Sequence, residues 1–225
     1  MRAKVRAVLF DATGTLIELR ERVGESYARI AERHRVRIPA WRIDDAFRRI
    51  LARSEPRVFP DADLDDVPGL ERAWWRAVVR ATFRAADQTI PFADFDAFFA
   101  EVWAWYATAD AWRTRPGVLE SLAALRRDGL ALGVVSDFDY RLHEILESLE
   151  IAELFDVVTL AGEHGFAKPD ARLFEVALRA LGCTAAEALY VGDDPDRDLA
   201  GARRAGLAAL DVRTLGSFAE LRSHL

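Results

Sequence analysis

Cysteine is almost absent from the sequence, because Cys183 is the only one among 225 residues. A single thiol excludes an intramolecular disulfide and argues against a cysteine-based metal site, which fits a reducing compartment. Long apolar runs are also absent, since no stretch approaches the roughly 18 residues that a membrane span requires. The apolar run at residues 7–10 is too short for the hydrophobic part of a signal peptide. We therefore expect a cytoplasmic protein that does not enter a membrane.

An excess of positive charge is lacking as well. The formal net charge is −6, and both signs are spread along the chain without an isolated basic cluster. A phosphate backbone would therefore be repelled more often than attracted, and we expect no nucleic-acid partner. The balance of 51% hydrophobic and 30% charged residues is typical of a globular protein. The sequence does not decide the oligomeric state, and both a monomer and a homodimer stay open.

Short apolar segments alternate with helical patterns in most of the chain. The first apolar segment, at 5–10, ends at Asp11, and further strand patterns lie at 130–135, 157–160, 188–191 and 207–212. Helical patterns at 118–127, 173–181 and 199–205 separate several of these strands. Such alternation implies right-handed crossovers. The sequence therefore predicts an α/β fold, a doubly wound parallel sheet covered on both faces.

The alternation stops between residues 17 and 113, where four apolar patterns have helical spacing. All six tryptophans lie in this region, a shift in composition that predicts a separate hydrophobic core. We interpret these rings as packing between helices. The acidic stretch at 61–66 and the nearby prolines predict a solvated loop in the middle of the insert; they are Pro56, Pro60 and Pro68.

Reactive side chains stand where predicted strands end. Asp11 ends the first strand, Ser136 the second, and the pair Asp193 and Asp194 the fourth, while Lys168 follows the third strand at some distance. In an open α/β sheet, ligands bind beyond the carboxyl ends of the strands. A nucleophilic carboxylate, a hydroxyl, an ammonium and two carboxylates form a coherent set for phosphoryl transfer.

This chemistry requires a cation, because carboxylates crowded around a phosphate dianion repel one another. Mg²⁺ is the natural choice, with Asp11, Asp193 and the Thr13 carbonyl as ligands. Lys168 would offset the remaining negative charge. The phosphate oxygens would be held by Ser136 and by N–H groups of the first loop, which contains Gly14 and Thr15. Asp11 would then attack phosphorus, and water would hydrolyse the acyl phosphate.

Four segments together resemble the motifs of the haloacid dehalogenase-like superfamily: residues 11–16, 134–136, 168–169 and 191–198. The resemblance implies a Rossmann-like core with strand order 3-2-1-4-5, formed by residues 1–16 and 114–225, and a helical cap at 17–113. Segments 19–21, 23–28, 74–75 and 136–141 are similar to the rhythmically-expressed-gene-two-like branch. The implied activity is a Mg²⁺-dependent aspartyl-phosphate phosphatase acting on a small phosphate ester or acyl phosphate.

Four further residues near these motifs are candidates for the site. Asp198 is a candidate partner of Lys168, and Asp194 either contacts the metal or complements a helix N-terminus. Asp137 and Arg20 are candidates for substrate contact, although Asp137 also fits an ordinary turn.

Thr13 departs from the usual phosphatase pattern, which has an aspartate two residues after the nucleophile as general acid and base. A threonine hydroxyl cannot readily protonate a leaving group, and losing that function typically costs ~10²–10⁴ in rate. The sequence thus predicts a slow phosphatase, one limited to good leaving groups, or one that borrows an acid from the cap. The cap candidates are Glu18, Glu21, Glu25 and His34.

Three alternatives remain open. A 2-haloacid dehalogenase shares the fold and nucleophile without a metal, but its fourth motif is less acidic than residues 191–198. A phosphotransferase would pass the phosphoryl group from Asp11 to an acceptor other than water. A non-catalytic interaction module would use the tryptophan-rich insert as a docking surface.

Overall fold

A parallel β-sheet forms the centre of the molecule in the computed structural model, which describes residues 4–89 and 91–225. Residues 1–3, assigned above to the core, and residue 90 of the insert lie outside the described residues. Within them, the sheet has five strands in the order β5-β4-β1-β6-β7, and each neighbouring pair is parallel. The predicted order 3-2-1-4-5 is therefore confirmed. The strands are β1 Ala7–Phe10, β4 Ala131–Ser136, β5 Val157–Leu160, β6 Ala188–Gly192 and β7 Ala208–Asp211.

Helices cover both faces of this sheet, which explains why β1 is apolar at every position. Val8 and Phe10 belong to one hydrophobic cluster, and Ala7 and Leu9 belong to another on the opposite face. The first cluster includes residues of α5 (Val118–Arg127), α6 (Arg141–Ser148) and the C-terminal 3₁₀ helix Phe218–His224. The second includes residues of α8 (Ala171–Leu181) and α9 (Ala200–Arg204), with the short α7 (Ala161–His164) nearby. Further 3₁₀ turns are Ala152–Leu154, Ala185–Glu187 and Val212–Thr214.

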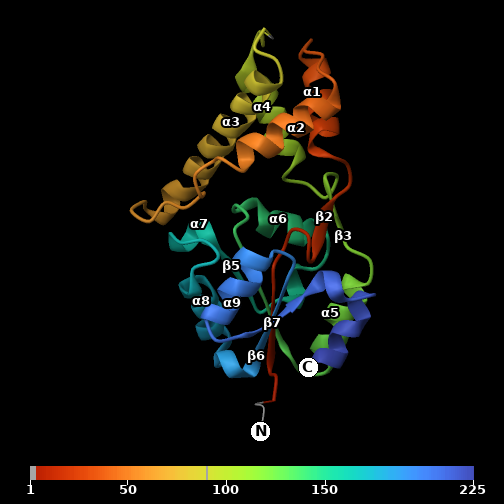
Figure 1. Ribbon diagram of the computed structural model, residues 1–225, viewed down its shortest axis with the longest axis vertical. Helices are drawn as coiled ribbons and strands as arrows, with labels where there is room; N and C mark the ends of the chain where they lie inside the picture. Colours follow the sequence, from red (N-terminus) through yellow and green to blue (C-terminus); the bar gives the residue numbers. More distant parts are fainter. Residues whose placement is uncertain (1–3, 90) are drawn as a thin grey trace.

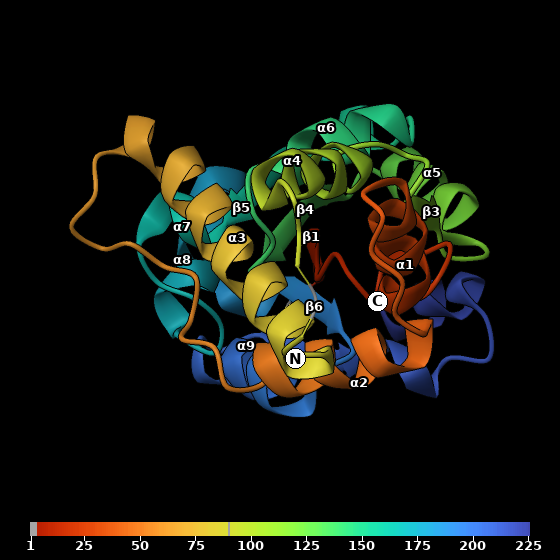
Figure 2. The ribbon, with the colours of Figure 1, turned by 90° about the horizontal axis from the view of Figure 1, so that it is seen from above.

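The insert forms a helical layer above the carboxyl ends of the strands (Figure 1). Its helices are α1 Val23–Arg33, α2 Ala40–Leu51, α3 Val67–Ala86 and α4 Phe95–Trp105, in the four regions with helical spacing. They enclose a hydrophobic cluster of their own that includes Tyr27, Ile43 and Phe98. Figure 2 shows α1–α4 from above, over the core. We call this layer the cap.

Two short antiparallel strands join the cap to the core. Strand β2 (Ile17–Leu19) pairs with β3 (Trp112–Thr114), with Ile17 opposite Thr114. The predicted limits between core and cap, 16/17 and 113/114, fall at this ribbon, and they stay a prediction. No helix in the described part of the chain has both the length and the apolarity needed to cross a membrane.

Two local predictions need correction. Pro68 does not break the insert but lies in the first turn of α3, where its missing N–H removes no helical hydrogen bond. A 3₁₀ turn at Leu64–Asp66 precedes it, so the predicted loop ends earlier. The last helix likewise begins as a π-helix at Pro195–Leu199 rather than at residue 199. This irregular turn starts directly after Asp194, which caps it.

Candidate active site

Asp11 lies at the carboxyl end of β1, between the ends of β4 and β6. Its backbone N–H donates to the carbonyl of Val191 at 2.9 Å, which continues the ladder with β6. After Asp11 the chain turns sharply, and the N–H groups of Leu16 and Ile17 return to the Ala12 carbonyl. Asp11 is only 6% exposed, and burial raises the pKa of its carboxyl to about 7.

Lys168 joins two buried carboxylates. Its Nζ lies 2.5 Å from Asp11 Oδ1 and 2.6 Å from Asp198 Oδ1, and the lysine itself is buried. Burial alone would lower the pKa of Lys168, but Asp11, Tyr190 and Asp198 raise it well above its ordinary value. Lys168 is therefore a fixed positive charge beside Asp11.

Asp198 is held by hydrogen bonds on both of its oxygens. Oδ1 accepts from Lys168 and from the Tyr190 hydroxyl, at 2.6 and 2.9 Å. Oδ2 accepts from the backbone N–H groups of Asp193 and Asp194, at 3.2 and 3.1 Å. The contact with Lys168 that we expected is present, and Asp198 also fixes the backbone that carries Asp193.

Asp193 is the carboxylate best placed to share a cation with Asp11. Oxygens of Asp11, Asp193 and Asp198 lie within 4.8 Å of one another. Burial, followed by the nearby Asp198 charge, raises the pKa of the Asp193 carboxyl. No hydrogen bond or ion pair joins the Asp193 side chain to another of the described residues, whereas Asp198 already has four hydrogen bonds. Asp11 and Asp193 therefore have oxygens to offer to a hard cation.

The first loop can approach the Asp193 carboxylate closely because Gly14 has no side chain. A Cβ at Gly14 would lie 2.6 Å from Asp193 Oδ2, and the residue has a φ of +92°, which favours glycine. Arg115 donates to the Gly14 carbonyl at 2.6 Å and thereby holds the loop in place. The close approach of the loop backbone to Asp193, together with oxygen ligands only, fits Mg²⁺.

The other residues of the predicted phosphate site fall into two groups. Ser136, Asp137 and Thr13 line the same cavity as Asp11 and Lys168. Ser136 is buried and its Oγ accepts from the Phe138 N–H at 3.1 Å. Asp137 is engaged with protein groups, since its Oδ1 accepts from the Lys168 N–H at 2.9 Å and its carboxylate pairs with Arg197.

Two other candidates, Thr15 and Arg20, do not line this cavity. Thr15 is fully buried, with no hydrogen-bond partner for its hydroxyl among the described residues. Arg20 is exposed and its Nε donates to the carbonyls of Ala109 and Trp112. Asp194 lines the cavity, yet its side chain caps the π-helix by accepting from Asp196 and Arg197, both at 2.9 Å. Of the two roles expected for Asp194, the hydrogen bonds at the helix N-terminus are therefore present.

None of the four acids suggested from the cap lies in the cavity lining within the described residues. Glu18 pairs with Arg113, and Glu21 pairs with Arg29. Glu25 accepts from the backbone N–H of residue 22 in a capping box. His34 lies 2.9 Å from a Glu101 carboxylate oxygen. Each of these groups has a structural partner, so the sequence hypothesis of a borrowed acid gains no support from them.

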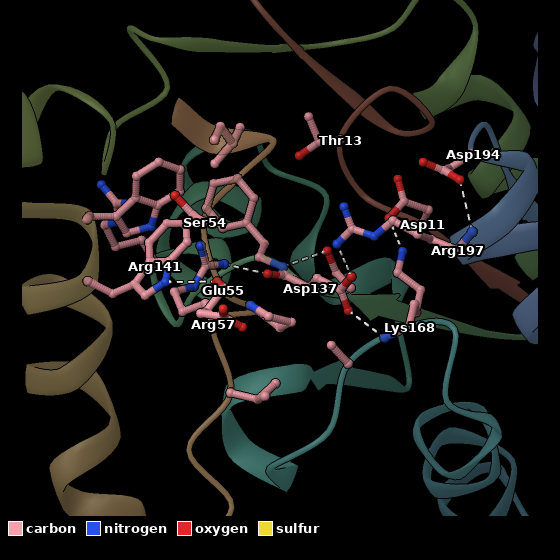
Figure 3. Close-up of a pocket in the computed structure, with 18 of the residues that line it drawn as sticks. Asp11, Thr13, Ser54, Glu55, Arg57, Asp137, Arg141, Lys168, Asp194 and Arg197 are labelled. Atoms are coloured by element: carbon pink, nitrogen blue, oxygen red, sulfur yellow. Dashed lines mark hydrogen bonds and ion pairs between the residues drawn. The ribbon is translucent and has the colours of Figure 1, made fainter. Parts of the chain in front are cut away.

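A cavity of about 1040 Å³ extends from Asp11 and Lys168 to the cap helices. Figure 3 shows Asp11, Lys168 and Asp194 on one side of Asp137, and Arg57, Glu55 and Arg141 on the other. The cap tryptophans were interpreted as packing between helices, and this is incomplete. Trp41 is 68% exposed, while four of the others also line the cavity: Trp74, Trp75, Trp103 and Trp112.

A buried ionic cluster between cap and core was missed from the sequence. Asp139 is fully buried and accepts from Arg141 Nε and Nη2, both at 2.7 Å, and from Trp75 Nε1. Arg57 Nε lies 3.6 Å from Glu71, whose carboxylate accepts from the Tyr140 N–H. Burial opposes ionisation of Asp139, but Arg141 holds its pKa below the ordinary value. The sequence signals were the branch-like segments 74–75 and 136–141 and, within the second, the spacing of Asp139 and Arg141 two residues apart.

Residues 5–206 match the sequence model of the haloacid dehalogenase-like hydrolases. The chain belongs to this family. A curated relative, haloacid dehalogenase-like hydrolase domain-containing protein 3 of Mus musculus, is 35% identical over 212 residues, which cover 92% of this chain and 81% of the relative. The rhythmically expressed gene 2 protein of Drosophila melanogaster is 27% identical over 91% of this chain and 81% of its own length. The predicted superfamily and branch resemblance are confirmed.

More distant or shorter matches carry more specific names. The phosphoserine phosphatase of Thermus thermophilus is 45% identical over 92 residues, 40% of this chain and 37% of that protein. Among solved structures, a dehalogenase with an intermediate complex has a TM-score of 0.72 at 20% identity, covering 100% of this chain and 99% of the other. A HAD phosphatase from Thermococcus onnurineus has a TM-score of 0.65 at 21% identity, covering 98% of this chain and 97% of the other. At such identity the structures show the shared fold.

Proposed function

We propose that this hydrolase is a Mg²⁺-dependent phosphatase that forms a phospho-aspartate on Asp11. The observation that carries the proposal is the cluster of Asp11, Asp193 and Asp198 carboxylates around the buried Lys168. A phosphatase-named relative and a phosphatase-named structural neighbour support it. The substrate would be a small phosphate ester or acyl phosphate that enters the cavity beneath the cap.

Each polar side chain would have a separate task. An Asp11 oxygen forms a bond to phosphorus while the bond to the leaving oxygen breaks, and water then attacks phosphorus to release inorganic phosphate and restore the carboxylate. Lys168 stabilises the negative charge on Asp11 and on the transferring group. Ser136 donates to a phosphate oxygen. Asp198 and Tyr190 hold Lys168 in position.

Asp11, Asp193 and the Thr13 carbonyl would hold Mg²⁺, which would neutralise the carboxylates and the phosphate oxygens when bound. Thr15 would offer its backbone N–H group to the phosphate, whereas the Gly14 N–H that we expected there already donates to the Ile17 carbonyl at 2.8 Å. The structure gives Asp194, Asp137 and Arg20 protein partners, so we assign them no contact with substrate.

Thr13 supplies no carboxyl, so the leaving group would depart without protonation by that residue. We therefore propose that the enzyme prefers leaving groups that are stable as anions.

Two further expectations stay predictions. Cell fractionation tests the cytoplasmic location, and limited proteolysis tests the limits between core and cap.

The test is hydrolysis of p-nitrophenyl phosphate and acetyl phosphate, with Mg²⁺ and with EDTA, by wild type and Asp11→Asn. The proposal predicts release of phosphate that needs Mg²⁺ and disappears in Asp11→Asn. A dehalogenase is the second candidate, because a dehalogenase-named structure has the same fold over the whole chain. Chloride release from 2-chloropropionate in EDTA, without any phosphatase activity, would favour that candidate instead.

A further inference from the structure

Aromatic rings form a continuous wall in the cavity, and this wall begins beside the phosphate site. Phe138 lies two residues after Ser136, and both line the cavity. The Phe138 ring packs edge-on against Trp112 with centroids 5.3 Å apart, and Trp112 packs against Tyr106 at 6.2 Å. Phe47 of α2 extends the apolar lining on the cap side. The rings contact one another, so protein packing holds the wall in place.

The two arginines on the cap side of the cavity, Arg57 and Arg141, already have partners. The Arg141 guanidinium forms two hydrogen bonds with the Asp139 carboxylate and lies 3.5 Å from the centroid of Trp103. Arg57 lies near Glu71 and donates to the Asp137 carbonyl. Arg141 and Arg57 therefore keep internal partners, and the described lining residues favour an apolar body over a second anionic group at this end.

We propose that the substrate is an aryl phosphate, in which a flat apolar ring system carries the phosphoryl group on a phenolic oxygen. The proposal rests on the proposed phosphatase function and names its substrate class. Two independent features lead to it: the aromatic wall next to Ser136, and threonine at position 13 in place of an acid. A phenolic oxygen has a pKa of about 10, so it departs far more readily as an anion than an alkyl oxygen does.

The reaction balances without a further co-reactant. An Asp11 oxygen bonds to phosphorus, and the aryl oxygen leaves with the bonding electron pair as a phenolate. Water then attacks phosphorus, the acyl phosphate bond breaks, and the Asp11 carboxylate is restored. The proton lost by water passes to solvent and neutralises the phenolate, so the products are a phenol and inorganic phosphate.

The experiment compares kcat/KM with Mg²⁺ for 2-naphthyl phosphate, phenyl phosphate, glycerol 1-phosphate and acetyl phosphate. We expect 2-naphthyl phosphate to exceed phenyl phosphate by about tenfold, because the larger ring buries more apolar surface. It should exceed glycerol 1-phosphate by at least about 10²-fold, because an alkyl oxygen needs an acid. Acetyl phosphate, which has a good leaving group but no ring, reports the basal chemistry.

Variants separate recognition by the wall from leaving-group chemistry. Phe47→Ala should lower kcat/KM for 2-naphthyl phosphate by about tenfold more than kcat/KM for acetyl phosphate, which has no ring to contact the wall. Trp41→Ala, on the same helix but 68% exposed and outside the cavity lining, should change neither. If Phe47→Ala fails to fold, Val23→Trp gives a second test, since a ring added to this half-buried cavity residue should penalise naphthyl more than phenyl phosphate.

The outcomes distinguish the two proposals. If acetyl phosphate is hydrolysed with Mg²⁺ and Asp11, but 2-naphthyl phosphate is no better than glycerol 1-phosphate, the aryl assignment is overturned and the phosphatase stands. Equal losses for acetyl and 2-naphthyl phosphate in Phe47→Ala would also overturn it. If none of the four compounds is hydrolysed in an Asp11-dependent way by folded protein, the phosphatase proposal falls, and the aryl assignment falls with it.

Discussion

Replacing Lys168 with methionine should strongly destabilise the protein. Methionine has a similar length but no charge, so the change removes the partner that lies 2.5 Å from Asp11 and 2.6 Å from Asp198. Both carboxylates are buried, at 6% and 2% exposure. Removing one partner from a buried ionic cluster costs about 3–5 kcal/mol, because charge is left uncompensated. We expect a loss of that size in the free energy of unfolding.

The assay is urea unfolding of wild type and Lys168→Met, each in EDTA and in Mg²⁺. A cation bound to the folded state adds about 2.7 kcal/mol when its concentration is 100 times its dissociation constant. Mg²⁺ should therefore restore part of the lost stability in Lys168→Met, because it supplies positive charge to Asp11 and Asp193. Activity should fall at least ~10²-fold in the same variant, since Lys168 also stabilises the transferring group.

Arg172→Met is the matched control. Arg172 forms an ion pair with Asp170 at 2.6 Å, but the arginine side chain is 64% exposed, so solvent screens the pair. This variant should unfold at the same urea concentration as wild type. A loss of less than about 1 kcal/mol in Lys168→Met would refute the view that the lysine neutralises two buried carboxylates.

Three further substitutions test separate parts of the site. Thr13→Asp should raise hydrolysis of an alkyl phosphate by about 10²-fold or more and leave acetyl phosphate nearly unchanged, and equal alkyl rates would contradict our account of Thr13. Gly14→Ala should weaken Mg²⁺ binding in calorimetry, because its Cβ would meet Asp193 Oδ2, whereas Gly129→Ala, with a similar φ of +79° and open space, should not. Burial raises the pKa of Glu71 from 4.5 to about 7, so the folded state binds the extra proton and wild-type stability falls as pH rises through that window. Glu71→Gln should remove this contribution, which amounts to at most about 3 kcal/mol in the free energy of unfolding between pH 5 and 8, measured with urea. If the free energy of unfolding depends on pH in the same way in wild type and Glu71→Gln, this account of Glu71 is wrong.

The strand pattern and the residues at strand ends were predictable from the sequence, because both depend on local order. A run such as residues 7–10, followed by Asp11, is buried on both faces of a parallel sheet and delivers its next residue to the carboxyl edge. Parallel neighbours then bring Asp11, Ser136 and Asp193 to one edge without any knowledge of side-chain contacts. Lys168 was expected at this edge because it follows the third strand and also fits the third motif of the superfamily.

The cap side of the cavity was not predictable, because its contacts join distant segments. Arg57 meets Asp137 across 80 positions, and Trp75 meets Asp139 across 64. Periodicity assigns such residues to helices or loops but does not say which faces oppose each other. Tyr190 was missed for a related reason, since a tyrosine within an apolar strand reads as core until Asp198 is seen 2.9 Å from its hydroxyl.

The most direct test of the central claim is to trap the covalent intermediate. Wild-type enzyme turning over acetyl phosphate in Mg²⁺ is quenched rapidly in acid, digested, and examined by mass spectrometry for the peptide that contains Asp11. Our account predicts one phosphoryl group on Asp11, absent when Asp11→Asn or EDTA is used. Mg²⁺-dependent turnover with no phosphorylated Asp11 at any quench time, or with the phosphoryl group on another residue, would contradict it.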